Sequence, residues 1–226
     1  MAVMRSAPVE LVSYDPAGTP RGTVVLMHAF TRSPRDLQGL AMRAVSRGAK
    51  VLMPHLGAWW WPRSTNNARY LSRIAEAVER QRSPGPVVIV GHSAGAAAGA
   101  WVAARLMDAG VDVSLLVLVD GVESPSGTLR RSWSALERLP VLAICAPPSR
   151  CNRRGALEAW LLSQVRSADS ALEVVHLPGM GHGDIEGAGI RVYCRMCGDD
   201  PGAPARDALV TLVEDAIERG LSAIAK

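Results

Sequence analysis

The chain contains the stretch Pro86-Val87-Val88-Ile89-Val90-Gly91-His92-Ser93-Ala94-Gly95-Ala96, on which the predicted fold depends. Four apolar residues, three of them valine, run directly into a Gly-x-Ser-x-Gly pentapeptide. An alanine-rich segment with good helix propensity follows, from Ala96 to Ala109. On its own the pentapeptide would indicate only a glycine-rich turn, because glycine and serine are common residues. Between a strand and a helix it is typical of a nucleophile elbow, so we predict that Ser93 is a nucleophile.

Two glycines flank Ser93, each two residues away. A β-carbon at Gly91 or Gly95 is expected to collide with the neighbouring strand or helix, so the turn requires glycine at both positions. The Ser93 hydroxyl would then stand above the sheet at the N-terminal end of a helix. The helix dipole and the free amides at that end favour developing negative charge.

The composition is that of a globular protein. The 226 residues are 48% hydrophobic and 20% charged, which predicts one domain, 1–226, with a large core. The net charge is +4, but the basic residues are scattered and do not alternate with aromatic residues, so nothing indicates nucleic-acid binding. Residues 1–10 lack the apolar core of a signal peptide, and no apolar run has the length of a membrane span. We expect a cytoplasmic protein without stable membrane insertion and leave its oligomeric state open.

Four cysteines occur late in the chain, at Cys145, Cys151, Cys194 and Cys197. Their number allows two disulfides or a zinc site of four thiolates. The spacing is poor for zinc, and a domain of this size does not need a covalent cross-link. We therefore expect free thiols, or one labile pair, in a reducing compartment, and no metal or cofactor.

Strand-like and helix-like segments alternate along the chain. This order predicts an α/β fold: a mostly parallel twisted sheet with helices on both faces and no large cap domain. The first two expected strands could form an antiparallel edge of this sheet. Strands are expected at 9–14, 23–27, 50–53, 87–90, 113–119, 140–146 and 172–177. Helices are expected after Ser33 up to Gly48, and at 66–82, 96–109, 129–139, 155–166 and 204–219.

A serine hydroxyl is a poor nucleophile at neutral pH, so it needs a base, and the base needs an orienting carboxylate. In parallel sheets reactive groups gather at the carboxyl ends of the strands. His182 follows the last expected strand in a glycine-rich loop and is the predicted base. His92, inside the elbow, is expected to be structural. His28 is expected to hold the loop that carries an oxyanion donor, and His55 is placed where it could touch substrate.

The orienting carboxylate is predicted to be Asp120. This residue directly follows the strand at 113–119, whereas the loop 146–151 after the next strand contains no aspartate or glutamate. Glu123 lies close behind Asp120 and remains an alternative. Asp184 is only two residues from His182 and is poorly placed to bond its ring.

Two amides are needed to stabilise a developing oxyanion. Ala94, the residue after the nucleophile, is expected to supply one. The loop after the strand at 23–27 supplies the other, from Phe30 or, by a small shift, from Ala29. Three consecutive tryptophans, Trp59-Trp60-Trp61, cannot all face inward from one strand or helix. They either bind substrate or cover the end of the sheet as a hydrophobic lid.

Three motifs, His28-Ala29-Phe30, Gly91-His92-Ser93-Ala94-Gly95 and Gly181-His182, carry a family resemblance. Through them the chain resembles the α/β-hydrolase superfamily over essentially its whole length. Ala29 departs from the usual His-Gly of the first motif.

The second half is similar to chlorophyllases and their esterase relatives. The similarity rests on Leu118-Val119-Asp120-Gly121-Val122, Cys145-Ala146-Pro147 with Asn152, Gly181-His182-Gly183-Asp184 and the late cysteines. In that family the acid follows the strand that Asp120 follows here. Ala94 and Ala96 depart from the usual arginine and second glycine of that family's elbow.

The residues and the resemblance together predict a serine esterase acting on a small-molecule ester with an apolar part. Ser93 would attack the ester, His182 would move the proton, Asp120 would orient His182, and Ala94 with Phe30 would stabilise the tetrahedral intermediate. One alternative is a thioesterase or acyltransferase of a biosynthetic pathway that uses the same residues. Another is a non-catalytic binding protein with a hydrolase fold.

Overall fold

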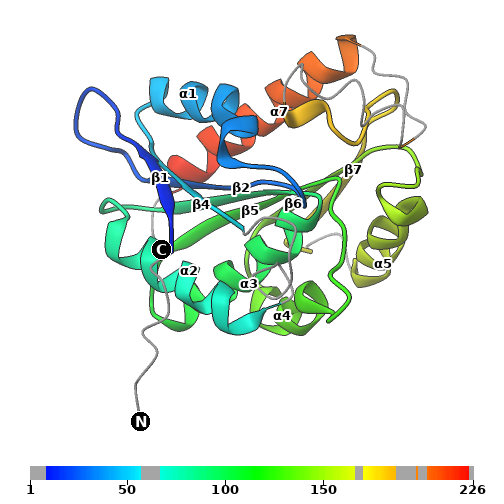
Figure 1. The fold of residues 1–226 in the computed structure, drawn as a ribbon, viewed down its shortest axis with the longest axis horizontal. Helices are drawn as coiled ribbons and strands as arrows, with labels where there is room; N and C mark the ends of the chain where they lie inside the picture. Colours follow the sequence, from blue (N-terminus) through cyan, green and yellow to red (C-terminus); the bar gives the residue numbers. More distant parts are fainter. Residues whose placement is uncertain (1–8, 57–66, 166–169, 187–196, 198–202, 224–226) are drawn as a thin grey trace.

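The computed structural model describes residues 9–56, 67–165, 170–186, 197 and 203–223 (Figure 1). Its strands are β1 (Leu11–Tyr14), β2 (Thr23–Met27), β3 (Lys50–Pro54), β4 (Val87–His92), β5 (Val113–Val119), β6 (Val141–Cys145) and β7 (Leu172–His176). Its α-helices are α1 (Gln38–Ser46), α2 (Ala68–Gln81), α3 (Ala94–Asp108), α4 (Thr128–Leu136), α5 (Ala156–Gln164) and α7 (Ala203–Leu221). Short 3₁₀ turns are η1 (Pro34–Leu37), η2 (Arg153–Gly155) and η3 (Asp184–Glu186).

The seven strands form one sheet in the order β1-β3-β2-β4-β5-β6-β7. All neighbours are parallel except β1, which pairs antiparallel with β3. The expected antiparallel edge therefore exists, but the expected pairing of the first two strands is wrong. Both sides of β2 are already occupied, because Thr23 is in register with Lys50 of β3 and with Val87 of β4.

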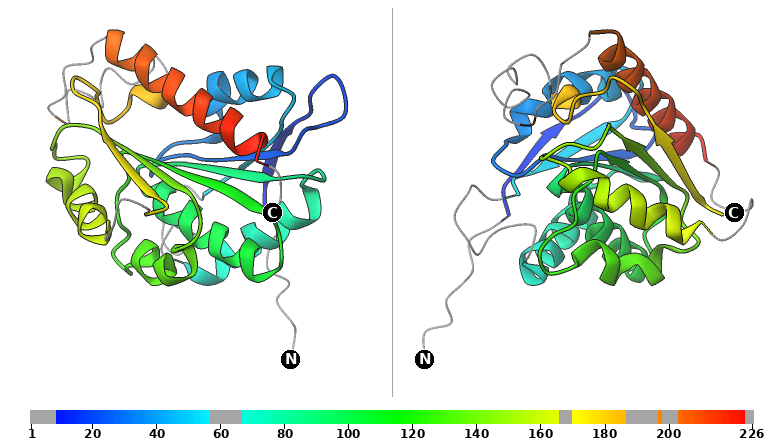
Figure 2. Two further views of the ribbon diagram at one scale, coloured as in Figure 1. Left: turned by 180° about the vertical axis from the view of Figure 1, so that it is seen from behind. Right: turned by 90° about the vertical axis from the view of Figure 1, so that its right-hand side faces the viewer.

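Helices cover both faces of the sheet, as Figures 1 and 2 show. Alternate residues of each buried strand point to opposite faces, so the sheet divides the core into two layers. In β4, Val87 and Ile89 pack on the side of α2, α3, α4 and α5, whereas Val88 and Val90 pack on the side of α1 and α7. Each buried strand thus contributes apolar side chains to both layers, which explains its nearly continuous apolar sequence.

Small residues let α3 lie close to the sheet. Ala96, Ala97, Ala100 and Ala103 are fully buried in the layer between β4 and the neighbouring helices. The start of the chain's first helix differs from the expectation in one detail: the turn Pro34–Leu37 is 3₁₀, and the α-helix begins at Gln38.

Six parallel strands end at the same edge of the sheet, so the loops after them meet there. Within the described residues, no group of helices forms a cap domain over this edge. None of the helices in these segments is both long enough and apolar enough to span a membrane.

Candidate active site

Ser93 lies in a sharp turn between β4 and α3. Its backbone angles, φ 53° and ψ −120°, are rarely adopted by residues other than glycine. A β-carbon at Gly91 would collide with the carbonyl oxygen of Gly95, and a β-carbon at Gly95 would collide with the carbonyl oxygens of Met27 and His28. Both glycines are therefore required by space, and the elbow packs backbone to backbone against the end of β2.

The structure brings Ser93, His182 and Asp120 together from three different loops. The Oγ of Ser93 lies 3.0 Å from Nε2 of His182, and Nδ1 of His182 lies 2.5 Å from Oδ2 of Asp120. Ser93 and Asp120 are buried, and the His182 side chain is 12% exposed. A hydroxyl, an imidazole and a carboxylate in this order form a chain along which the hydroxyl proton can move to the ring.

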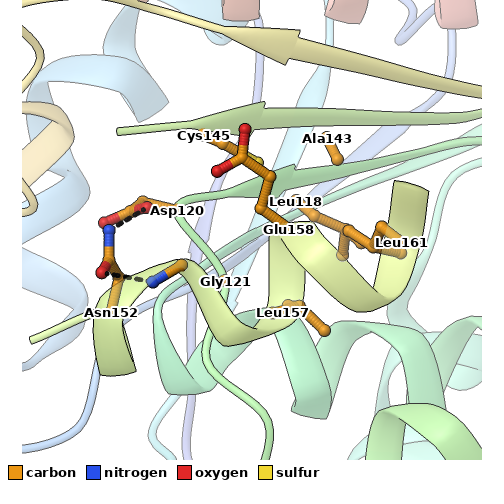
Figure 3. A pocket seen from close by; sticks show the side chains of 10 residues that line it. Leu118, Asp120, Gly121, Ala143, Cys145, Asn152, Leu157, Glu158 and Leu161 are labelled. Atoms are coloured by element: carbon orange, nitrogen blue, oxygen red, sulfur yellow. Dashed lines mark hydrogen bonds between the residues drawn. The ribbon is translucent and has the colours of Figure 1, made fainter. Parts of the chain in front are cut away.

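The second oxygen of Asp120 is fixed by two donors. Oδ1 accepts hydrogen bonds from the Ala146 amide and from Nδ2 of Asn152, each 3.1 Å long. The loop that contains Asn152 bends around its side chain, because its Oδ1 accepts the amides of Ser149 and Gly155. Figure 3 shows Asn152 reaching Asp120 from the start of the α5 region. Asp120 itself has a φ of 40°, so the backbone is strained here as well as at Ser93.

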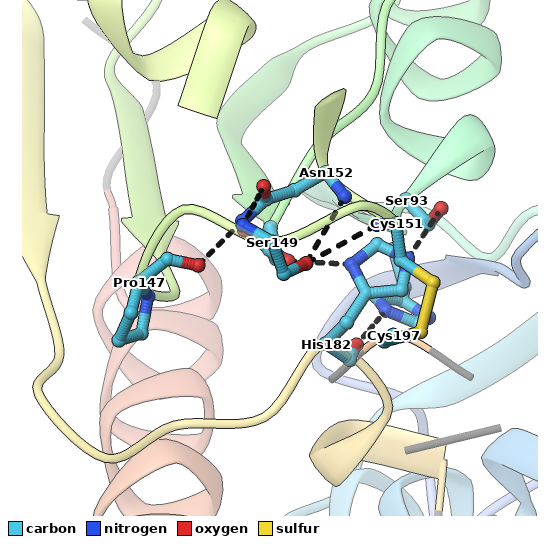
Figure 4. The surroundings of a disulfide bond; sticks show 9 residues. Ser93, Pro147, Ser149, Cys151, Asn152, His182 and Cys197 are labelled. Carbon is cyan, nitrogen blue, oxygen red and sulfur yellow. Dashed lines mark hydrogen bonds and ion pairs between the residues drawn. A yellow bond between two sulfur atoms is a disulfide. The ribbon is translucent and has the colours of Figure 1, made fainter. Parts of the chain in front are cut away.

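A disulfide joins Cys151, the neighbour of Asn152, to Cys197. Figure 4 draws Ser93 and His182 among the surroundings of this bond. One cysteine pair was among the alternatives expected from the sequence. Cys145 is a free, buried thiol whose pKa is raised to about 12, mainly by burial. Cys194 lies outside the described residues.

The candidate oxyanion donors lie at the ends of two neighbouring strands. Ala94 is the first residue of α3, where the amide has no partner within the helix. Phe30 lies in the loop after β2 and is 53% exposed. The amide of Ala29, the alternative to Phe30, donates to Oε1 of Glu186 over 3.1 Å. Ala29 therefore already has an acceptor, which leaves Phe30 as the better placed of the two.

Comparison with known proteins finds similarity in structure only. No protein-family model matches the sequence, and no curated protein matches it. An esterase from Pyrobaculum calidifontis has a TM-score of 0.65 at 19% identity, over 97% of this chain and 83% of the esterase. A dienelactone hydrolase from Anabaena variabilis has a TM-score of 0.65 at 17% identity, over 97% and 94% of the two chains. An alpha-beta serine hydrolase homologue from Coxiella burnetii has a TM-score of 0.60 at 18% identity, over 91% of each. The chain has the α/β-hydrolase fold.

The predicted fold class is thereby confirmed. At such low identities the likeness concerns the α/β-hydrolase fold alone, and the narrower resemblance to chlorophyllases stays a prediction. In this fold the loop after β5 carries Asp120 and the loop after β7 carries His182, each beside the elbow.

His92 lies in a buried network that the sequence did not indicate. Its Nδ1 is 2.7 Å from Oε1 of Glu186, and its Nε2 is 2.6 Å from the carbonyl oxygen of His182. Oε2 of Glu186 pairs with Nε of Arg32 at 2.9 Å. Burial alone would raise the pKa of Glu186, but attraction to His92, hydrogen bonds and Arg32 lower it to about 2. Burial likewise opposes the charged form of His92, but attraction to Glu186 outweighs it, so the pKa of His92 is raised.

The remaining histidines of this edge support the loops. Nε2 of His28 accepts the Leu56 amide over 3.1 Å, and Nδ1 lies 2.8 Å from the carbonyl oxygen of Ala29. Burial lowers the pKa of His28, so the ring is neutral and joins the loops after β2 and β3. The ring of His55 packs edge-on against His28, with 5.6 Å between their centres.

The two other carboxylates considered from the sequence bind backbone amides. Glu123 accepts the amides of Ser124, Leu129 and Arg130 and so caps the start of α4. Asp184 accepts the Gly181 amide over 2.7 Å.

The predicted substrate contacts Trp59, Trp60 and Trp61 lie outside the described residues. Within the described segments, no cluster of three or more histidine, cysteine, aspartate or glutamate side chains is arranged to hold a metal ion.

Proposed function

We propose that the protein is a serine esterase that hydrolyses carboxylic esters through an acyl-enzyme on Ser93. The observation that carries this proposal is the continuous path from Ser93 Oγ through the His182 ring to Asp120, with distances of 3.0 and 2.5 Å. The α/β-hydrolase fold, which is shared with esterases, supports the same reading.

The first half-reaction forms the acyl-enzyme. Ser93 Oγ attacks the ester carbonyl carbon while its proton passes to Nε2 of His182. Asp120 accepts a hydrogen bond from Nδ1–H of the ring, which selects the tautomer with a free Nε2 and stabilises the imidazolium that forms. The tetrahedral oxyanion is bound by the amides of Ala94 and Phe30. When the intermediate collapses, the C–O bond breaks and His182 returns the proton to the departing alcohol.

The second half-reaction releases the acid. Water gives a proton to Nε2 of His182 and attacks the acyl carbon, and the Ser93 oxygen then leaves with the proton that His182 returns. No step needs a metal or cofactor. Thioester cleavage or acyl transfer would use the same residues, with a thiol as the leaving group or a second alcohol in place of water.

The proposed substrate is a small-molecule ester with an apolar part. The exposed aromatic ring of Phe30 beside the proposed oxyanion site supports an apolar contact, and Trp59, Trp60 and Trp61 are proposed to add to it. A non-catalytic binding protein would not require the alignment of Ser93 and His182, so that alternative is less well supported.

The test is labelling with a fluorophosphonate, followed by mass-spectrometric mapping and assays on aryl esters and acyl thioesters. We expect Ser93 to carry the adduct, and the Ser93→Ala variant to lose both labelling and hydrolysis. Ser163→Ala, which removes an exposed serine of α5, is the matched control and should retain both. An adduct on another residue would overturn the assignment, and an inert protein would favour the binding alternative.

We also propose that residues 1–226 form one domain and that the protein acts in the cytoplasm. The single continuous sheet supports the first proposal. The second predicts that the disulfide between Cys151 and Cys197, which the structure contains, is a labile pair and is reduced in growing cells, because a reducing compartment opposes stable disulfides. Rapid alkylation of the thiols in intact cells, read by mass spectrometry, tests it; a fully oxidised pair would argue for an oxidising compartment.

A further inference from the structure

The ring of His92 lies between two hydrogen-bond acceptors. Its Nε2 faces the carbonyl oxygen of His182 at 2.6 Å, and a carbonyl has no proton to give, so Nε2 must carry one. Its Nδ1 faces Oε1 of Glu186 at 2.7 Å, where one proton is shared between the nitrogen and the carboxyl oxygen. The charge of the ring depends on which atom holds that proton.

The surroundings of Glu186 place the proton on His92. Oε1 of Glu186 already accepts the Ala29 amide, and Oε2 faces the guanidinium of Arg32 at 2.9 Å. These two donors, one of them a cation, favour the ionised form of the carboxylate even before His92 is counted. The side chains of His92 and Glu186 are 2% and 1% exposed, so water does not compete for these bonds. Asp120, on the side of His182, adds attraction for a positive ring.

The charged ring has a mechanical consequence. A neutral His92 that still donated to the His182 carbonyl would turn the lone pair of Nδ1 toward the Glu186 carboxylate, and the two acceptors would repel each other at 2.7 Å. Glu186 would then have to move, and with it the hydrogen bond to Ala29. The second proton on His92 therefore keeps the loops after β2 and β7 in place beside the elbow.

We propose that His92 is a positioning residue, held as an imidazolium, which ties the His182 loop to the oxyanion loop through Glu186. The inference rests on the proposed function, since it takes His182 as the base and Phe30 as an oxyanion donor. His92 precedes Ser93 directly, so a single buried charged cluster connects the three loops that bear nucleophile, base and oxyanion donor.

The first test is nuclear magnetic resonance of the histidine ring nitrogens in the folded wild-type protein between pH 5 and 9. We expect both nitrogens of His92 to carry a proton across this range. A single ring proton at pH 7 would overturn the inference, whatever the activity of the protein. Fluorophosphonate labelling of the same sample tests the proposed function separately. If the protein is labelled but His92 is neutral, only this inference is refuted. If the protein is not labelled, the proposed function is refuted.

The second test is the pH profile of Glu186→Gln, which keeps the shape of the side chain but removes the negative charge. We expect the variant to lose activity as pH rises, to about 100-fold below wild type in kcat at pH 9, because a neutral His92 lets the base loop shift. KM should change much less. Glu186→Asp, which keeps the charge, should show no such descending limb.

The matched control is His176→Gln, which removes a histidine that also faces a carboxylate, Glu158, but is 44% exposed. Its profile should match that of the wild type. A uniform loss of activity in Glu186→Gln at every pH would instead indicate a merely structural role and overturn the inference. If Glu186→Gln does not fold, the ring protonation measured in the wild type decides.

Discussion

Replacing Asp120 by asparagine should abolish most of the activity without disturbing the fold. The surroundings of Asp120 determine how the new side chain orients. The oxygen that now accepts the Ala146 amide and Asn152 Nδ2 faces two donors, so asparagine must place its own oxygen there. Its NH₂ group then points at Nδ1 of His182.

This orientation fixes the wrong tautomer of His182. The asparagine NH₂ donates to Nδ1, so the ring proton moves to Nε2, the atom that must accept the proton of Ser93. The equivalent substitution in serine proteases lowers kcat about 10⁴-fold. That factor corresponds to about 5 kcal/mol of lost transition-state stabilisation.

The assay measures kcat for an aryl ester and the melting temperature of the same samples. Glu123→Gln is the matched control, since Glu123 caps α4 and does not contact His182 in the described structure. Loss of such a cap costs about 1 kcal/mol, or about 3 °C in melting temperature, with kcat nearly unchanged. Near-normal kcat in Asp120→Asn, or a greater loss of kcat in Glu123→Gln, would show that the acid is wrongly assigned.

Three further outcomes are expected. The pKa of Glu186 is lower in the folded state than in the unfolded chain, so its ionisation stabilises the folded state at any pH above the ordinary glutamate pKa. The free energy of unfolding should therefore fall as the pH is lowered from about 4.5 toward 2. The fall should be smaller in Glu186→Gln. Asn152→Ala should lower kcat about tenfold with little change in KM, since Asp120 loses one charge-assisted hydrogen bond; unchanged kcat would make Asn152 a loop residue only. Alanine at single positions of 59–61 should raise KM for long-chain and aryl esters by up to about 30-fold, which corresponds to about 2 kcal/mol for one buried ring. An unaltered KM in variants that still fold would mean that the tryptophans only cover the sheet.

The sequence predicts those parts of the site that depend on strand ends. Ser93 and Asp120 each follow a buried strand of clear apolar pattern, and His182 lies in the loop after the partly exposed edge strand β7. A parallel sheet brings the positions after its strands to one edge. The fold follows from the same patterns, since alternating apolar runs and helical periodicities specify the layers. The partner of β1 was not predictable in this way, because a short edge strand carries little information on which neighbour it pairs with.

The supporting contacts depend on tertiary structure instead. Glu186 meets His92 across 94 residues of sequence, and Asn152 meets Asp120 across 32. A lone glutamate after a glycine-rich loop or a lone asparagine in a proline-rich loop has many possible partners, and neither spacing nor periodicity selects one. A signal did exist for Asn152: together with Cys145-Ala146-Pro147 it is one of the residues through which the second half resembles chlorophyllases.

The positive φ angles of Ser93 and Asp120 imply a trade-off between catalytic activity and thermal stability. Each angle strains the backbone by about 1 kcal/mol or more, and glycine would relieve that strain at either position. Ser93→Gly and Asp120→Gly should therefore yield inactive proteins. Their melting temperature should exceed that of the wild type where the relieved strain is larger than the free energy of the lost hydrogen bonds. Directed evolution that selected for thermostability alone would enrich variants that lack these two side chains. Each round of stabilisation must therefore also screen for catalytic activity.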